Sequence, residues 1–264
     1  CGYQDFRDFA CGRQFYVDKT HFIAEWLRSE SKVTLITRPR RFGKTTLLST
    51  VENFLDPRFG GHSEYFEKLQ VWTEEDCRTL YGTIPVISVS FGSCKGRDYA
   101  QAIRGMISSF YNLYESHRYL MEGEKLDAED KAVYQRMKKA LEMGDETKAE
   151  SAIPRLCRLL YRYYGIWPVI LLDEYDTPLL EAYTDGYWEE MIGTCRQLFH
   201  AAFKENAYYS RAIITGVTRV TKNSLFSDLN NIEVDTVTCD AYSDCFGFTE
   251  EEVIDALPVS YTHL

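Results

Sequence analysis

The stretch from residue 33 to residue 48 constrains the fold of this chain more than any other part of it. It begins with an apolar, β-branched run, passes through a loop rich in proline, arginine and glycine, and continues into Leu47, Leu48, Val51 and Phe54. The spacing of these last residues places them on one face of a helix. A strand, a loop and a helix in this order are what a phosphate-binding loop requires, because N–H groups at a helix N-terminus and the positive end of its dipole attract an anion.

Three loop residues are of the types that bind the phosphates and metal ion of a nucleotide. Gly43 allows close approach of the backbone, Lys44 can reach the β- and γ-phosphates, and the Thr45 hydroxyl can ligate Mg²⁺. In the usual pattern G-x-x-x-x-G-K-[ST], the first glycine falls at position 38, where this chain has Arg38. A residue with a side chain at that position either takes a strained conformation or changes the turn. From this stretch alone, a basic loop that caps an ordinary helix remains the alternative.

A second motif follows a later apolar run. Residues 169–172 are all apolar and are followed by Asp173 and Glu174, as in a strand buried on both faces with acids at its carboxyl end. Ligands of open parallel sheets bind at that end, so Asp173 can hold Mg²⁺ through water beside Thr45. Glu174 can polarise the water that attacks the γ-phosphate, which favours a water-activating enzyme over a kinase. The alternative is a solvated strand end or helix cap. The loop upstream at 38–45, called the lysine loop below, argues against this alternative.

Further apolar runs complete the predicted fold, with strands at residues 84–91, 211–216 and 232–238. With the two strands above they predict an α/β three-layer sandwich: a largely parallel five-stranded sheet with helices on both faces. The helical segment at about 98–165 is too long for a simple crossover, so we expect it to form an added helical layer. Thr249 and Glu252 have the spacing of a capping box at the start of a helix.

Two other regions have candidate roles near a bound nucleotide. Thr215, at the tip of the fourth strand, could contact the γ-phosphate or the attacking water. Arg219, three residues beyond a glycine, could add positive charge near the transferred phosphoryl group, or it is a surface arginine. The segment at 15–27 has a helical pattern just upstream of the lysine loop and could lie near the base. The alternative for this segment is a helix that covers one edge of the sheet.

The composition excludes some classes of function. The chain has 264 residues, of which 45% are hydrophobic, enough for one large α/β domain or one domain with an appendage. Its 40 acidic and 30 basic residues give a net charge of −10, and such a surface repels nucleic acid on average. A phosphate site would account for the densest basic cluster, which consists of Arg38, Arg40, Arg41 and Lys44. Nucleic acid is therefore not an expected partner of this chain alone.

The cysteines indicate a reducing compartment. None of the eight belongs to a Cys-x-x-Cys pair or has a neighbouring histidine at a ligand spacing. Cys157 and Cys195 fall on apolar helical faces, which favours buried free thiols, and His117 belongs to a similar stripe that indicates packing. No apolar run approaches the ~18 residues of a membrane span, and no signal peptide is visible. We expect a cytoplasmic protein without membrane contact.

Both ends of the chain look artificial. It starts at Cys1 rather than with methionine, and residues 259–264 could be the translation of a sequencing adapter. We therefore expect one native domain at 1–258, from a truncated open reading frame, followed by a non-native tail at 259–264.

Several motifs occur in one order and together carry a family resemblance. They are Tyr16-Val17-Asp18-Lys19-Thr20, Arg38-Pro39-Arg40-Arg41-Phe42-Gly43-Lys44-Thr45, Leu172-Asp173-Glu174-Tyr175-Asp176-Thr177-Pro178, Ile214-Thr215-Gly216-Val217, Phe226-Ser227-Asp228-Leu229-Asn230-Asn231 and Phe246-Gly247-Phe248-Thr249. With them the chain resembles the predicted AAA-ATPase-like family of bacterial and archaeal proteins, from about Phe15 to Leu257. The arginine at position 38 matches that family's own loop. Relatives often continue into a C-terminal domain that resembles restriction-type nucleases.

The resemblance implies ATP binding and Mg²⁺-dependent hydrolysis of ATP to ADP and phosphate. Contacts with the nucleotide are expected from Arg38, Arg40, Arg41, Phe42, Gly43, Lys44, Thr45 and Thr46. Thr45 and Asp173 would hold the metal ion, Lys44 the phosphates and Glu174 the water, while Thr215 would sense the γ-phosphate.

Two alternatives stay open at this point. A nucleotide-dependent switch would bind ATP, hydrolyse it once or slowly, and act on an unknown protein partner. A nucleic-acid-associated ATPase would be stimulated by DNA in a salt-dependent way, although the acidic balance argues against it. Steady-state turnover of Glu174→Gln separates the enzyme from the switch.

Overall fold

The structure is a computed structural model that describes residues 4–12, 16–218, 225–226 and 231–256. The predicted tail at 259–264 and Arg219 lie outside the described residues. In chain order the elements are α1 (Phe6–Cys11), α2 (His21–Arg28), β1 (Val33–Thr37), α3 (Lys44–Leu55), η1 (Pro57–Phe59), η2 (Ser63–Tyr65), α4 (Gln70–Thr73), α5 (Glu75–Leu80), β2 (Val86–Ser90), α6 (Tyr99–Ser116), η3 (Arg118–Met121), α7 (Ala128–Glu142), α8 (Glu146–Ala149), α9 (Ala152–Tyr164), β3 (Val169–Asp173), α10 (Thr177–Asp185), α11 (Trp188–Phe199), η4 (His200–Lys204), β4 (Ala212–Gly216), β5 (Ile232–Asp235) and α13 (Glu250–Ala256). None of these helices is both long and apolar enough to cross a membrane.

The centre of the fold is a sheet of five parallel strands in the order β2-β3-β4-β1-β5. The predicted α/β class and five-stranded sheet are confirmed, although β5 ends at Asp235, before the end of the predicted strand at 232–238. β4 lies between β1 and β3, with Thr215 of β4 paired to Ile36 of β1. Because the carboxyl ends of parallel strands meet at one edge of the sheet, the residues that follow β1, β3 and β4 come together there.

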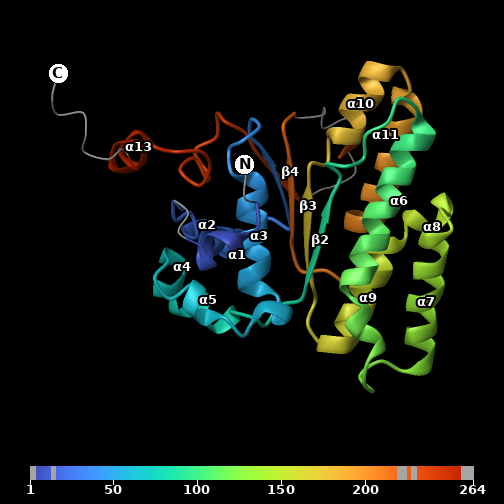
Figure 1. Cartoon of the computed structure of the whole chain (residues 1–264), viewed down its shortest axis with the longest axis horizontal. Helices are drawn as coiled ribbons and strands as arrows, with labels where there is room; N and C mark the ends of the chain where they lie inside the picture. Colours follow the sequence, from blue (N-terminus) through green and yellow to red (C-terminus); the bar gives the residue numbers. More distant parts are fainter. Residues whose placement is uncertain (1–3, 13–15, 219–224, 227–230, 257–264) are drawn as a thin grey trace.

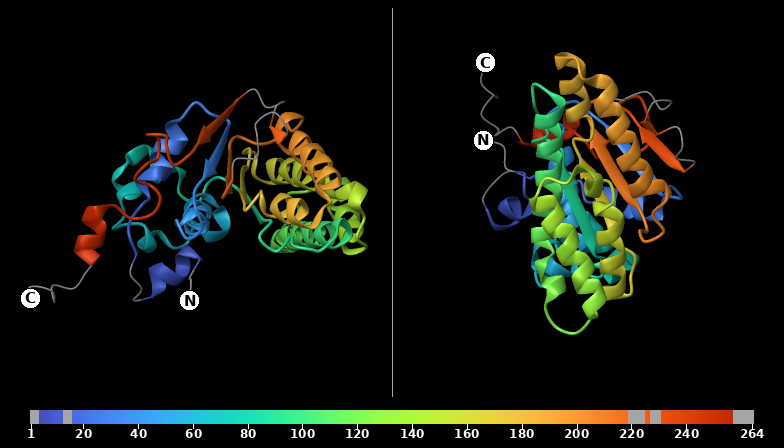
Figure 2. Two further views of the ribbon diagram at one scale, coloured as in Figure 1. Left: turned by 90° about the horizontal axis from the view of Figure 1, so that it is seen from above. Right: turned by 90° about the vertical axis from the view of Figure 1, so that its right-hand side faces the viewer.

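Helices cover both faces of the sheet and make three layers (Figure 1, Figure 2). Helices α1 to α5 lie on one face, and α6 to α11 lie on the other. The strands contribute to both cores because successive side chains point to opposite faces. Leu35 belongs to the core beneath α6 to α11, and Ile36 belongs to the core beneath α3. Every residue of β1 and β3 is buried, as expected for strands covered on both sides.

The long segment between β2 and β3 contains α6 to α9. α6 and α9 pack against β2, and α7 packs against both of these helices. Part of the segment therefore covers the sheet, and α7 adds a further layer. His117 caps α6 and is buried, with its ring nitrogens 2.8 Å from the Leu113 carbonyl and 3.2 Å from the Val86 carbonyl. Burial lowers the pKa of His117 to about 4, which agrees with its predicted packing role. Cys157 and Cys195 are buried free thiols, as predicted.

After β5 the chain at 236–249, called the returning segment below, runs back past α2 and leads into α13 (Figure 1). The ring of Phe22 in α2 packs against Tyr242 and Phe246 of this returning segment, with ring centroids 4.9 and 5.9 Å apart. α13 begins with the predicted capping box, since the Thr249 N–H donates to Glu252 at 2.8 Å and the Glu252 N–H donates to the Thr249 hydroxyl at 3.3 Å. The segment after β5 thus packs against α2 on the α3 face of the sheet.

Candidate functional site

The loop from Arg38 to Gly43 joins β1 to α3 at the carboxyl edge of the sheet. Two of its residues have left-handed backbone, Arg41 with φ 70° and Gly43 with φ 80°. Glycine adopts this conformation without strain, whereas for another residue it costs about 1–3 kcal/mol, a strain that is common at ligand sites. Residues 39–43 are exposed, and the Leu47 N–H bonds to the Gly43 carbonyl at 2.8 Å, so α3 begins directly after them. The loop therefore presents exposed, strained backbone at the N-terminus of a helix.

The ammonium group of Lys44 lies beneath this loop. Its Nζ donates hydrogen bonds to the carbonyls of Arg38 and Pro39, both at 2.8 Å, and the residue is buried. Burial lowers the pKa of Lys44, while the negative charges of Asp173, Asp176 and Glu174 oppose that shift. The lysine is thus held by carbonyls of the loop. An anion within the loop would offer its charge a stronger partner.

The side chain of Arg38 points away from the loop interior. Its guanidinium donates to Asp235 of β5 at 2.6 Å and to the Thr37 carbonyl at 3.1 Å, and it stacks 4.9 Å from the ring centroid of Phe246. Only 4% of the Arg38 side chain and 1% of the Asp235 side chain are exposed. The loop backbone is also tied to β4, since the Arg38 N–H donates to the Gly216 carbonyl at 3.2 Å. The predicted nucleotide contact of Arg38 is therefore not prepared in this structure, because its guanidinium, its N–H and its carbonyl are all bonded within the fold.

Three predicted site residues meet at the carboxylate of Asp173. The Thr45 hydroxyl donates to its Oδ2 at 2.6 Å, and the Thr215 hydroxyl donates to its Oδ1. The Glu174 N–H also donates to Oδ1, at 3.0 Å. Asp173 therefore links α3, β3 and β4, although Thr45 lies 128 residues away from it in sequence. A buried carboxylate beside a hydroxyl is a set of hard oxygen donors, which suits Mg²⁺.

Glu174 extends the acidic pair beyond the end of β3. Its φ of 51° is left-handed, and its Oε2 accepts a hydrogen bond from the Thr177 hydroxyl at 3.2 Å. A Cβ atom on Gly92, just beyond β2, would lie 2.7 Å from that same oxygen. The carboxylate thus occupies space that only a glycine at position 92 leaves open. The sequence signal for Gly92 was its place just after a buried strand, a signal too general to assign a role.

Asp176 belongs to one of the quoted motifs, but the sequence assigned it no role. It is 1% exposed, and its Oδ2 accepts hydrogen bonds from the N–H groups of Val217 and Thr218 at 2.9 and 2.7 Å and from the Thr218 hydroxyl at 2.7 Å. The Tyr175 hydroxyl donates to the Thr218 carbonyl at 2.8 Å. The turn after β3 therefore holds the chain that leaves β4 and leads to Arg219, itself outside the described residues.

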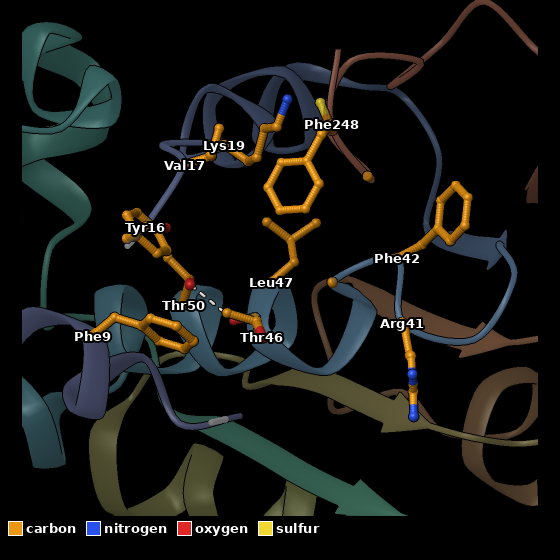
Figure 3. Close-up of a pocket in the computed structure, with 13 residues that line it drawn as sticks. Phe9, Tyr16, Val17, Lys19, Arg41, Phe42, Thr46, Leu47, Thr50 and Phe248 are labelled. Carbon is orange, nitrogen blue, oxygen red and sulfur yellow. Dashed lines mark hydrogen bonds between the residues drawn. The ribbon is translucent and has the colours of Figure 1, made fainter. Parts of the chain in front are cut away.

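An apolar pocket of about 150 Å³ lies beside the first turns of α3 (Figure 3). Its walls come from three parts of the chain and are formed by Phe9, Tyr16, Val17, Lys19, Arg41, Phe42, Gly43, Thr46, Leu47, Thr50, Cys245, Gly247 and Phe248. Gly247 ties the returning segment to the loop, because its N–H donates to the Phe42 carbonyl at 3.2 Å. For the segment at 15–27 the sequence left open a place near the base or a helix that covers one edge of the sheet, and part of this segment lines the pocket. The contribution of residues 245–248 was not expected.

Comparison with known proteins finds a curated relative of this chain. A curated protein from Azotobacter chroococcum mcd 1, an uncharacterized protein in the vnfD 5' region, is 31% identical to the chain over 241 residues. That alignment covers 90% of the chain and 40% of the relative, so the chain spans less than half of the relative's length. No solved structure matches the chain.

A family model described as Predicted AAA-ATPase matches residues 1–226. These residues include the loop before α3, the acidic pair after β3 and Thr215 of β4. The resemblance expected from the motifs is confirmed over residues 1–226, and the five-stranded parallel sheet is consistent with a P-loop NTPase-like fold. The chain belongs to the family of predicted AAA-ATPases.

Proposed function

We propose that this protein binds ATP with Mg²⁺ and hydrolyses it. The observation that carries the proposal is the 2.6 Å contact between Thr45 and Asp173, which joins the lysine loop to the acidic strand end. Thr215 bonds to the same carboxylate, so β4 completes the arrangement. Membership of a family of predicted AAA-ATPases supports the same activity. The buried Lys44 beneath the exposed loop supports a triphosphate as the ligand.

Each site residue has a role in this proposal. Lys44 and the loop amides hold the phosphates, and Thr45 and Asp173 hold Mg²⁺, which when bound neutralises charge on the β- and γ-phosphate oxygens. Glu174 accepts a proton from a water molecule as the water oxygen bonds to the γ-phosphorus. The bond from that phosphorus to the β–γ bridging oxygen breaks, giving ADP and phosphate. Thr215 orients Asp173 and senses the γ-phosphate.

The base of the nucleotide is assigned to the apolar pocket. The pocket adjoins Gly43 and Thr46, so a nucleoside attached to phosphates in the loop would extend toward it. The rings of Tyr16 and Phe248 line it, and aromatic rings stack on a planar base. The exposed Phe42 stands at the loop side of the same pocket (Figure 3), while Arg40 and Arg41 give the exposed loop positive charge.

The free thiols support a reducing location such as the cytosol.

A slow or single-turnover switch is the second candidate. It is favoured by the position of Glu174, whose carboxylate is bonded to Thr177 and packed on Gly92. A base held in this way has to move before it can take a proton from water. The switch would act on a protein partner, and the net charge of −10 argues against nucleic acid in that role.

Phosphate release under multiple turnover tests the proposal. Lys44→Ala should abolish ATP binding, whereas Glu174→Gln should keep binding and lower turnover about 10²–10⁴-fold, as expected for loss of a general base. Lys68→Ala and Glu190→Gln change exposed residues of the same types and should leave both quantities unchanged. Equal ATP binding by wild type and Lys44→Ala would contradict the proposal. Tight ATP binding without turnover in the wild type would support the switch.

A further inference from the structure

A second cluster of ligand-type side chains lies outside the phosphate site. It consists of His21, at the start of α2, and Asp244 and Cys245, in the segment that returns after β5. Their potential ligand atoms all lie within 4.8 Å of one another. The imidazole and the thiol come from positions 224 residues apart, which is why no ligand spacing is visible in the sequence.

The distances within the cluster are close to those of a coordination shell. His21 Nε2 lies 3.2 Å from Cys245 Sγ and 3.4 Å from Asp244 Oδ2. Cys245 Sγ lies 3.7 Å from the other carboxylate oxygen, Asp244 Oδ1. Tetrahedral zinc with its usual bond lengths to nitrogen, oxygen and sulfur has ligand–ligand separations of about 3.4–3.6 Å. Rotation of one exposed carboxylate would therefore complete three corners of a tetrahedron.

The donor types select the metal ion. A thiolate and an imidazole are ligands that zinc accepts readily, whereas Mg²⁺ takes oxygen ligands. This set therefore differs in kind from the hydroxyl and carboxylate pair of Thr45 and Asp173. The exposure of the three side chains also fits a bound ion with one open side, because Cys245 is buried, His21 is half-buried and Asp244 is exposed.

The charges around the cluster favour a cation. Glu25 of α2 and Asp244 place two negative charges near the Cys245 thiol. Lys19 is the positive group nearby: its Nζ bonds to the Asp244 carbonyl at 2.5 Å. The same Nζ is paired with Glu252 at 2.5 Å, which compensates its charge.

We propose that His21, Asp244 and Cys245 bind one zinc-type divalent cation, with water in the fourth position. On binding, the thiol proton leaves to solvent as the bond from sulfur to the metal forms. The ion then joins the returning segment to α2 directly, in addition to the packing of Phe22 on its aromatic rings.

The site has a consequence for the apolar pocket. Cys245, Gly247 and Phe248 all line that pocket, so an ion on Cys245 would fix one of its walls. If the proposed nucleotide binding is correct, zinc should therefore raise the affinity for ATP. This consequence rests on the proposed function, whereas metal binding by the cluster does not.

Titration of the metal-free full chain with Co²⁺ tests the site. We expect one Co²⁺ per chain, with a thiolate-to-cobalt charge-transfer band that Zn²⁺ abolishes. Cys245→Ser should remove the band, and His21→Gln should weaken binding at least tenfold. Cys239→Ser and His62→Gln are controls at a half-buried cysteine and an exposed histidine, and they should bind as the wild type does. Asp244→Asn, at an exposed side chain, tests the site with little risk to folding.

Two outcomes would overturn the proposal. One is a wild-type chain without the thiolate band, and the other is a band that survives in Cys245→Ser. ATP binding measured with and without Zn²⁺ separates this proposal from the proposed function. Zinc bound by a chain that never binds ATP contradicts only the ATPase, and ATP bound by a chain that never takes zinc contradicts only the metal site.

Discussion

Arg38 takes the position where the usual phosphate-loop pattern has a glycine, and its role is structural. The guanidinium and the Asp235 carboxylate form a buried ion pair at 2.6 Å, and Phe246 stacks on the guanidinium. The side chain therefore fastens the start of the loop to β5 and to the returning segment. An arginine here lets the loop depend on a part of the chain almost two hundred residues away.

Removing one partner of this pair should destabilise the protein strongly. We expect Arg38→Met to lower the free energy of unfolding by about 3–5 kcal/mol, because the buried Asp235 charge loses its partner. The double variant Arg38→Met/Asp235→Leu should recover much of that loss, since it leaves no buried charge. Urea denaturation measures both variants. A loss below about 1 kcal/mol in Arg38→Met, the range of exposed pairs, would contradict the interpretation.

The site residues that could be predicted from sequence are those marked by a short local sequence pattern. Lys44 and Thr45 follow a glycine at a helix start, and Asp173 and Glu174 follow an apolar run, so a short window defines each of them. The partner of Arg38 could not be predicted, because no local pattern marks the place where Asp235 packs. The His21 contact to Cys245 was missed for the same reason.

At the scale of elements, the carboxyl ends of β1, β2, β3 and β4 build the site together. The apolar runs predicted each strand, but the order of the strands depends on how distant helices pack and could not be predicted from them. That order places β4 between β1 and β3, which brings Thr215 to Asp173. It also places the end of β2 next to β3, so that Gly92 meets Glu174.

This contact of Gly92 makes a prediction about catalysis. Gly92→Ala would place a methyl group 2.7 Å from Glu174 Oε2 and displace the carboxylate. We expect turnover to change several-fold with little change in ATP affinity, because the loop proposed to hold the phosphates is not touched. The matched control is Gly61→Ala, where a Cβ atom would meet nothing within 4 Å. Equal turnover of the two variants would remove Gly92 from the account of catalysis.

At the scale of the whole molecule, the apolar pocket joins segments from both ends of the described chain and from its first large helix. Phe9 and Tyr16 come from one end, Leu47 from α3, and Phe248 from the other end. Sequence patterns predicted the α/β fold but not that these segments line one pocket, because the returning segment has no strong periodicity of its own. Its position depends on aromatic packing such as that of Phe22 on Tyr242.

Phe248 offers a test of the pocket as the base site. Phe248 is 64% exposed, so Phe248→Ala should change stability little. Loss of an aromatic ring stacked on a base should weaken ATP binding by about 1–3 kcal/mol. Binding of inorganic triphosphate, which has no base, should not change. Tyr183→Ala removes an aromatic side chain that is 77% exposed, outside the pocket, and serves as the control. Equal losses for ATP and triphosphate would place the base elsewhere.

The return of the chain past α2 also has a consequence during synthesis. A ribosome releases the lysine loop and the acidic strand end well before the residues around Gly247 that bond to the loop. The sheet can begin to pack in N-to-C order, yet the wall formed by Cys245, Gly247 and Phe248 is added only after β5 has emerged. A nascent chain arrested before that point would therefore have the loop around Lys44 but would lack one wall of the pocket proposed for the base.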